Sequence, residues 1–406
     1  MSKLKTIVVA VCVIALPSVS HAQALPFSDG KWELHGDSTR IETVDGRGVL
    51  RLTTGGAYRR DVSLLDGTID ADVKVTRRRS FVYLNFRMQT DEEHEEFYLR
   101  PHKSLLPDAV QYSPVYQGQS GWQLYHGVRG AVPVEIEPDK WQRLRIVLSG
   151  QRAAFFLGDT IKPFMVIPHL AREPKAGYIG LSGFLPGGTP GSGAIAYFSN
   201  VSVRPGIPAH AFDSVPPSPS EPAGVIRSWE VGEAFAASDT ALSVIDPKWT
   251  ASMKRVPTEP EGFVNLHRYV AVPPGVRQWG VVAKTTLESA RGETRRLDLG
   301  FSDRITVFLN GRPVFNRDDS YDYLGRRDGL ITPNQASVYL PLVAGRNEIS
   351  VIVVDRFGGW AIMGSFRGSN IESGARPTLR CFGPSNSSCQ SPEASATRRS
   401  DHGLPD

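Results

Sequence analysis

The segment Arg295 to Phe315 (RRLDLGFSDRITVFLNGRPVF) most constrains the fold, because its apolar and polar side chains alternate. A period of two residues is typical of a half-buried β-strand and is incompatible with a helix. The dipeptide Asn310-Gly311 then supplies two residues that tolerate positive φ, as a tight hairpin turn requires. The segment therefore predicts antiparallel strands. Their apolar members are Leu297, Leu299, Phe301, Ile305, Val307 and Leu309.

The same kind of pattern recurs along two long regions of the chain. Short candidate strands separated by turn residues fill residues 49–203 and residues 229–366, and no long apolar period of 3.6 residues interrupts them. Many short strands with frequent turn signals are typical of sandwiches and barrels. We therefore expect an all-β protein made of two β-sandwich (jelly-roll) domains.

A proline-rich stretch separates these two regions. Residues 205–224 mix Pro with Ser and Ala, a composition that cannot bury a core and favours extended backbone. We expect a first domain at 25–204, a linker at 205–224 and a second domain at 225–370. The remainder, 371–406, has few large apolar residues and is expected to be a disordered tail.

The first residues have the character of an export signal. Lys3 and Lys5 precede an apolar stretch at 7–16 that is too short to span a bilayer, and small residues follow it. We expect a signal peptide at 1–24, cleaved after Ala22 or Ala24, and a periplasmic or extracellular protein. No later segment offers the ~20 apolar residues of a membrane helix.

The cysteine count, the net charge and the absence of two catalytic motifs each argue for or against a class of function. Two cysteines, Cys381 and Cys389, follow the signal and could form one disulfide in an oxidising compartment. The formal net charge is only +4, which argues against a nucleic-acid partner. Neither the Gly-x-Ser-x-Gly nucleophile motif nor the His-Glu-x-x-His zinc motif occurs, and no cofactor is expected.

In the first domain, the alternation of apolar and polar residues distinguishes a strand face that packs in the core from an opposite face that could bind a ligand. In the strand 81–88, Val82, Leu84, Phe86 and Met88 are expected in the core, so the residues between them point the other way. Aromatic rings can stack on a sugar ring, and planar polar groups beside them can pair with its hydroxyls. The aromatic loop that follows these strands could form the rim of such a binding site. An ordinary solvated sheet face with weak ion pairs is the alternative. The candidate ligand-binding residues are Tyr83, Asn85, Arg87, Glu96, Tyr98, Arg100, His102, Trp122 and Tyr125.

Catalytic candidates are fewer. Glycoside hydrolysis normally needs two carboxyl groups ~5–5.5 Å or ~6.5–9.5 Å apart. The acidic run at 91–96 is expected in a turn, where two acids do not share one strand face. Only Glu96 and Asp108 remain as a pair that loops could bring together.

The second domain carries two weaker candidates in the loop after Phe315. Asp318, Asp319 and Asp322 could supply oxygen ligands to a structural Ca²⁺, or they could lie in a solvated loop. A second sugar-binding platform could use aromatic and basic residues near that loop, although a packed strand residue is the favoured interpretation of Trp360. The platform candidates are Tyr321, Tyr323, Arg326 and Trp360.

Both domains resemble families of sugar-active proteins. The segments KWQRLRIVLSGQRAAFFLGD and GYIGLSGF…AYFSNVSV resemble the concanavalin A-like lectin/glucanase fold, which includes LamG-like and, more loosely, 3-keto-disaccharide hydrolase-like domains. The segments LGFSDRITVFLNGRPVF and LPLVAGRNEISVIVVDRFGG resemble galactose-binding-like jelly rolls. The acid motifs of the glucanases, Glu-x-Asp-x-x-Glu and Glu-x-Asp-x-Glu, are absent.

These resemblances imply a carbohydrate or polysaccharide partner for an exported binding protein. A glycan-processing hydrolase with unassigned carboxylates is one alternative to that expectation. A structural or adhesion protein that binds another protein is the second alternative. Function inferred from either fold is an analogy, because both folds host many activities.

Overall fold

The protein was studied as a computed structural model, which describes residues 22–127, 130–185, 193–208, 210–215, 224–238, 242–272, 275–322, 324–325 and 327–367. The expected tail with Cys381 and Cys389, the first 21 residues, Tyr323 and Arg326 lie outside this part of the chain. Strands dominate the described residues, and the helical elements are short 3₁₀ turns. The all-β expectation is confirmed.

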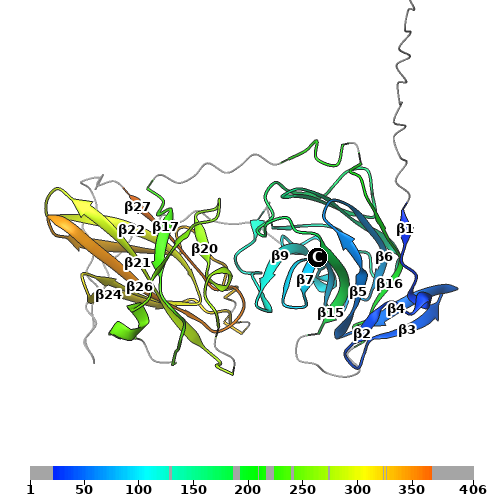
Figure 1. The fold of residues 1–406 in the computed structure, drawn as a ribbon, viewed down its shortest axis with the longest axis horizontal. Helices are drawn as coiled ribbons and strands as arrows, with labels where there is room; N and C mark the ends of the chain where they lie inside the picture. The colour runs from blue at the N-terminus through cyan, green and yellow to red at the C-terminus, as the bar shows by residue number, and fades with distance from the viewer. Residues whose placement is uncertain are drawn as a thin grey trace, which may run out of the picture. The chain divides into compact units, whose positions relative to one another are not determined.

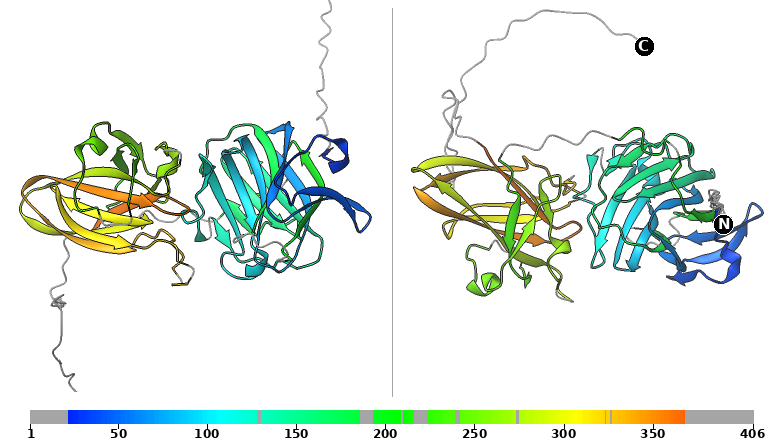
Figure 2. Two further views of the ribbon diagram at one scale, coloured as in Figure 1. Left: turned by 90° about the horizontal axis from the view of Figure 1, so that it is seen from below. Right: turned by 45° about the horizontal axis from the view of Figure 1, so that its top comes forward.

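Two antiparallel sheets form the first sandwich (Figures 1 and 2). Sheet 1 runs in the order β14 (Met165–Ile167), β13 (Arg152–Leu157), β12 (Gln142–Ser149), β6 (Gly67–Val75), β16 (Ala196–Arg204), β4 (Arg47–Leu52) and β3 (Arg40–Val44), with β1 (Gln23–Ala24) on β16. Sheet 2 runs in the order β10 (Gln119–Ser120), β9 (Val110–Tyr116), β8 (Glu93–Leu99), β7 (Phe81–Thr90), β15 (Gly177–Phe184), β5 (Gly55–Leu64) and β2 (Glu33–His35), with β11 (Ala131–Val132) on β9. The 3₁₀ turns are η1 (Phe27–Asp29) and η2 (Pro101–Lys103).

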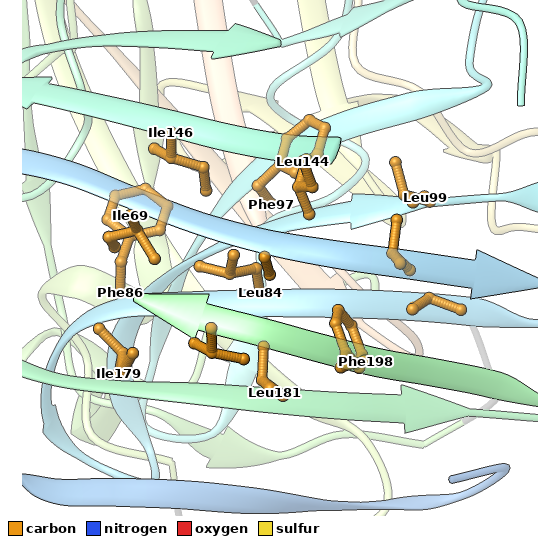
Figure 3. Packing of buried hydrophobic residues seen from close by; sticks show 14 of the residues in the cluster. Ile69, Leu84, Phe86, Phe97, Leu99, Leu144, Ile146, Ile179, Leu181 and Phe198 are labelled. Atoms are coloured by element: carbon orange, nitrogen blue, oxygen red, sulfur yellow. The ribbon is translucent and has the colours of Figure 1, made fainter. Parts of the chain in front are cut away.

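One hydrophobic core lies between these sheets, because alternate side chains of each strand point inward. Figure 3 shows Ile69, Leu144, Ile146 and Phe198 of sheet 1 packed with residues of sheet 2. The labelled residues of sheet 2 are Leu84, Phe86, Phe97, Leu99, Ile179 and Leu181. The core thereby fixes which face of each strand points away from the sandwich interior.

The second sandwich also has two antiparallel sheets. Sheet 3 runs in the order β19 (Lys254–Pro257), β17 (Ser228–Val231), β21 (Trp279–Ser289), β26 (Gly345–Asp355), β23 (Arg304–Leu309) and β24 (Arg312–Asp318), with β18 (Phe235–Ala236) on β21. Sheet 4 runs in the order β20 (Phe263–Asn265), β27 (Ala361–Arg367), β22 (Glu293–Ser302) and β25 (Ala336–Leu342). Two further 3₁₀ turns are η4 (Pro247–Thr250) and η5 (Leu266–Arg268).

The hairpin predicted at Asn310-Gly311 is confirmed. Leu309 of β23 pairs with Arg312 of β24, and both turn residues have positive φ (50° and 78°). The alternating residues Leu297, Leu299 and Phe301 are fully buried in the core of the second sandwich, as expected. Within the described residues, no helix is long and apolar enough to cross a membrane.

Candidate functional site

A row of side chains crosses sheet 2 on its outer face, the face turned away from the core. Antiparallel pairing sets Tyr58, Gly180, Asn85, Glu96 and Ser113 side by side on β5, β15, β7, β8 and β9. The strand neighbours of these residues belong to the hydrophobic core, among them Ala57, Leu181, Leu84, Phe97 and Tyr112. The row is therefore fixed by core packing and register together.

Two acceptor atoms in this row have no hydrogen-bond partner among the described residues. Asn85 donates through Nδ2 to Ser182 Oγ (3.1 Å), but its Oδ1 is unpaired although the residue is only 3% exposed. Glu96 accepts from Ser120 Oγ through Oε1 (2.5 Å), and its Oε2 accepts nothing from the described residues. Buried polar atoms normally find partners, so this pair offers two acceptors to donors from elsewhere.

Glu96 has no second carboxylate beside it among the described residues of the outer face. Burial raises the pKa of Glu96 to about 7, although the hydrogen bond from Ser120 lowers it. No neighbouring carboxylate contributes to that pKa, whereas a second acid close by would raise it further. Asp108, the other catalytic candidate, is bound by Arg100 and by Lys103 Nζ (2.5 Å). The described residues do not provide the paired carboxyls of a glycosidase at this face.

An aromatic cluster occupies the neighbouring part of the outer face. The rings of Tyr83 and Tyr98 lie 4.9 Å apart, and Phe81 lies 6.0 Å from Tyr98 and 6.0 Å from Phe184. Phe184 is 47% exposed and Tyr83 is half-buried, so aromatic surface borders the polar row. The hydroxyl of Tyr98 donates to Gln111 Oε1 (2.8 Å), and Tyr98 is only 2% exposed, so it supports the rings of Tyr83 and Phe81 from below the surface.

Phe81 and Phe184 were not among the candidate residues selected from the sequence. The signal that could have found Phe184 is the outward alternation of Gly180, Ser182 and Phe184 along β15. Phe184 also pairs directly with Phe81 in the register. Because β15 and β7 are far apart in the chain, no local sequence pattern predicts that these two residues pair.

Arg100 and His102 lie beside this cluster. The Arg100 guanidinium is 5.1 Å from the centroid of the Phe81 ring, and its charge is paired with Asp108. The His102 ring lies 5.7 Å from Phe81. Burial and the neighbouring Arg100 lower the pKa of His102 to about 4, so this imidazole is neutral at pH 7.

Arg87 does not lie on the outer face, in contrast to the expectation. Its φ of 49° and a register shift after Phe86 make a bulge in β7, and a bulge reverses the alternation of the residues that follow it. Arg87 consequently points to the core side, where Nε donates to Leu65 O (2.9 Å) and Nη2 to Gly150 O (2.7 Å). Met88, expected in the core, lies instead on the outer side, next to Gly180.

Trp122 and Tyr125 do not form an open rim. Residues 122–125 form a turn, held to β9 by hydrogen bonds from Gln111 Nε2 to Trp122 O and to Tyr125 O (2.7 Å). Both sandwiches belong to one compact unit of the chain. Trp122 packs 5.6 Å from Tyr321, and the Tyr125 hydroxyl contacts Glu259. These two aromatic residues therefore join the sandwiches.

The second sandwich does not assemble the expected calcium site. Asp318, Asp319 and Asp322 contact different partners, respectively Ser320 N, Arg317 and Gly325 N. No group of three or more His, Cys, Asp or Glu side chains that could hold a metal occurs within the described ranges. Trp360 is fully buried in the core and donates to Val353 O (3.2 Å), so it is not part of an exposed platform. Tyr321 is half-buried against Trp122 and Phe357.

Comparison with known proteins finds solved structures that resemble this chain at low sequence identity. No family model and no curated protein matches the chain. Similar solved structures include a carbohydrate-binding module from Bacillus subtilis, which is 18% identical, with 42% of this chain and 93% of the module covered and a TM-score of 0.33. A Bacillus licheniformis beta-glucanase is 11% identical, with 46% and 98% covered and a TM-score of 0.34. A lichenase derived from a mouse hindgut metagenome is 11% identical, with 46% and 99% covered and a TM-score of 0.35. The function is therefore inferred from the residues of the site and not from these likenesses.

Proposed function

We propose that the outer face of sheet 2 binds a carbohydrate and does not cleave it. The observation that carries this proposal is the directly paired Asn85 and Glu96, each with an acceptor oxygen that receives no hydrogen bond from the described residues. Sugar hydroxyls are donors, and two neighbouring hydroxyls can reach two neighbouring acceptors. The aromatic cluster beside them offers ring faces on which a sugar ring can stack.

The lack of a second carboxylate beside Glu96 among the described residues favours binding over hydrolysis. Retaining and inverting glycosidases both need a second carboxyl group within ~10 Å of the first. Glu96 has no carboxylate among the causes of its raised pKa, and Asp108 is neutralised by two cations. Without a second carboxylate, Glu96 can accept a hydrogen bond from a sugar hydroxyl but has no partner for hydrolysis.

A glycan array on the full mature chain, with product analysis of every hit, tests this proposal. We expect bound glycans without products, and a loss of about tenfold or more in affinity for the double variant Asn85→Ala/Glu96→Gln, since each removed hydrogen bond contributes about 1 kcal/mol or more. Glu288→Gln, an exposed acid on β21, is the control. Cleaved products that disappear in Glu96→Gln would identify a hydrolase instead, and unchanged affinity in the double variant would overturn this site.

We also propose that the chain is exported and that its leader ends at Ala22. Gln23 and Ala24 form β1 and pair with Val203 and Ser202, and Leu25 is fully buried. Cleavage after Ala24 would remove this strand, whereas cleavage after Ala22 keeps it. The mass of the protein recovered from a periplasmic fraction tests this. A chain that begins at Leu25 contradicts the position, and an uncut chain that stays in the cytoplasm contradicts export.

A further inference from the structure

A recess of about 500 Å³ lies where β8 begins, on the core side of sheet 2 and thus apart from the outer-face site. It is lined mainly by charged side chains of the first sandwich, and Arg268 adds one from the second. In contrast to the turn expected for the acidic run at 91–96, β8 begins at Glu93. Glu93 and Glu95 therefore share one strand face, and both line the recess.

Two buried groups in this recess face each other without completing their hydrogen bonds. Arg87 uses Nε and Nη2 for Leu65 O and Gly150 O, while its Nη1 has no hydrogen-bond partner. Glu95 accepts from the Tyr112 hydroxyl through Oε2 (2.6 Å), while its Oε1 accepts nothing. Arg87 Nη1 and Glu95 Oε1 are 3.8 Å apart, and the two residues are 3% and 1% exposed.

Such a pair can receive a polar group of a ligand. A buried donor or acceptor without a hydrogen bond lowers the stability of the fold by about 1–3 kcal/mol. Two such atoms beside one recess are therefore rare in proteins. A hydroxyl or carboxyl group that enters the recess could reach both atoms from one side, because they are only 3.8 Å apart. A ligand group that both accepts from Arg87 and pairs with Glu95 fits this position.

The charges of the recess favour a negative ligand. Its cations are Arg87, Arg172, Lys175 and Arg268, against the carboxyl groups of Glu93, Glu95 and Glu173. Burial raises the pKa of Glu95 to about 7, so this group carries less than a full negative charge at neutral pH. Arg172 pairs with Glu93 (2.7 Å), Arg87 with Asp66 (3.2 Å) and Arg268 with Glu259 (4.0 Å), so Lys175 is the cation of the recess that makes no ion pair with any described residue.

We propose that this recess binds a sugar unit that carries a carboxylate. The carboxylate accepts from Arg87 Nη1 and is attracted by Lys175 and Arg268, and a hydroxyl of the same sugar donates to Glu95 Oε1. The ligand class is a uronic acid, free or within an oligosaccharide. This site is separate from the outer-face site, since none of the residues of the polar row lines the recess. Either site could therefore bind its ligand without the other.

Isothermal titration of the full mature chain with glucuronate and galacturonate oligosaccharides tests this inference, with neutral oligosaccharides and sodium sulfate as comparison ligands. We expect the acidic sugars to bind more tightly than either. Lys175→Glu should weaken their binding about tenfold, because it reverses a charge at the rim of the recess. Lys162→Glu, which reverses an exposed charge of the same sandwich outside the recess, should leave it unchanged.

Two further variants separate this site from the outer face. Glu95→Gln keeps an acceptor for Tyr112 but changes the group beside Arg87, and it should weaken acidic sugars while folding remains intact by circular dichroism. Asn85→Ala should leave acidic-sugar binding in place even if it removes other glycan binding. Equal binding of neutral sugars, equal binding of sulfate, or unchanged affinity in both Lys175→Glu and Glu95→Gln would each overturn the proposal.

Discussion

The hydroxyl of Tyr125 lies 2.8 Å from both carboxylate oxygens of Glu259, and this contact joins a loop of the first sandwich to the second. Glu259 is 8% exposed, and burial raises its pKa to about 8, while the hydrogen bond from Tyr125 lowers it. Leu124, the preceding residue, is buried among Phe263, Ile331 and Met363. Tyr125 and Leu124 thus hold the loop through a polar and an apolar contact, in addition to the hydrogen bonds of Gln123 and His126 with the second sandwich.

Tyr125→Phe should lower the free energy of unfolding by about 1–2 kcal/mol, because it removes the hydrogen bond and leaves Glu259 buried without it. Chemical denaturation at pH 7 measures this. Tyr339→Phe is the matched control, since Tyr339 is 60% exposed. An equal loss in both variants would contradict a specific role for the Tyr125 contact.

Glu96→Gln should change how stability depends on pH. The pKa of Glu96 rises from an ordinary value near 4.5 to about 7 in the folded protein, so the folded state holds this proton more tightly than the unfolded state. The free energy of unfolding that this group contributes therefore falls as pH rises from about 4.5 to about 7. Gln cannot ionise, so the melting temperature of the variant relative to the natural protein should increase between pH 5 and pH 8.

Glu288→Gln is the control, because Glu288 is exposed. The difference in melting temperature between this variant and the natural protein should not change over the same pH range. Glu95, Glu259 and Asp303 also have raised pKa values and act in the same direction as Glu96, whereas the lowered pKa values of His94 and His102 act in the opposite direction, so the comparison of variant with natural protein isolates Glu96. A flat difference between Glu96→Gln and the natural protein would show that Glu96 is ionised without penalty in the folded state.

Phe184→Ala should weaken glycan binding at the outer face with little loss of stability, because Phe184 is 47% exposed and at the end of β15. A lost aromatic contact of ~0.5–1.5 kcal/mol corresponds to a decrease in affinity of about two- to tenfold. Titration with the best glycan of the array measures it. Phe357→Ala, an exposed aromatic residue of the second sandwich, should have no effect on this binding.

Gly177→Ala should destabilise the first sandwich by about 1–3 kcal/mol through overpacking. A methyl group at Gly177 would lie 2.4 Å from Met88 O and 2.6 Å from Arg87 C, both backbone atoms of the bulge. Gly48→Ala in β4, where a methyl group meets nothing within 4 Å, is the control. Equal melting temperatures for the two variants would contradict the bulge at Arg87.

The outer-face site shows which side-chain directions the alternation of apolar and polar residues can predict. Alternation along one strand correctly placed Tyr83 and Asn85 away from the core, because side-chain direction in a regular strand depends only on position. The same alternation placed Arg87 wrongly. A bulge adds a residue to one strand of a pair, and the partner backbone around Gly177 that accommodates it is distant in sequence.

The sequence by itself determined the fold class, the hairpin at Asn310-Gly311 and the buried residues of each regular strand, since these follow from the two-residue period and from local turn preferences. Only the tertiary structure decided which strands are neighbours. It therefore decided that Asn85 faces Glu96, that Phe184 meets Phe81, and that Arg87 lies 3.8 Å from Glu95. Register, bulges and burial arise from packing between segments far apart in the chain, and a linear pattern does not contain those contacts.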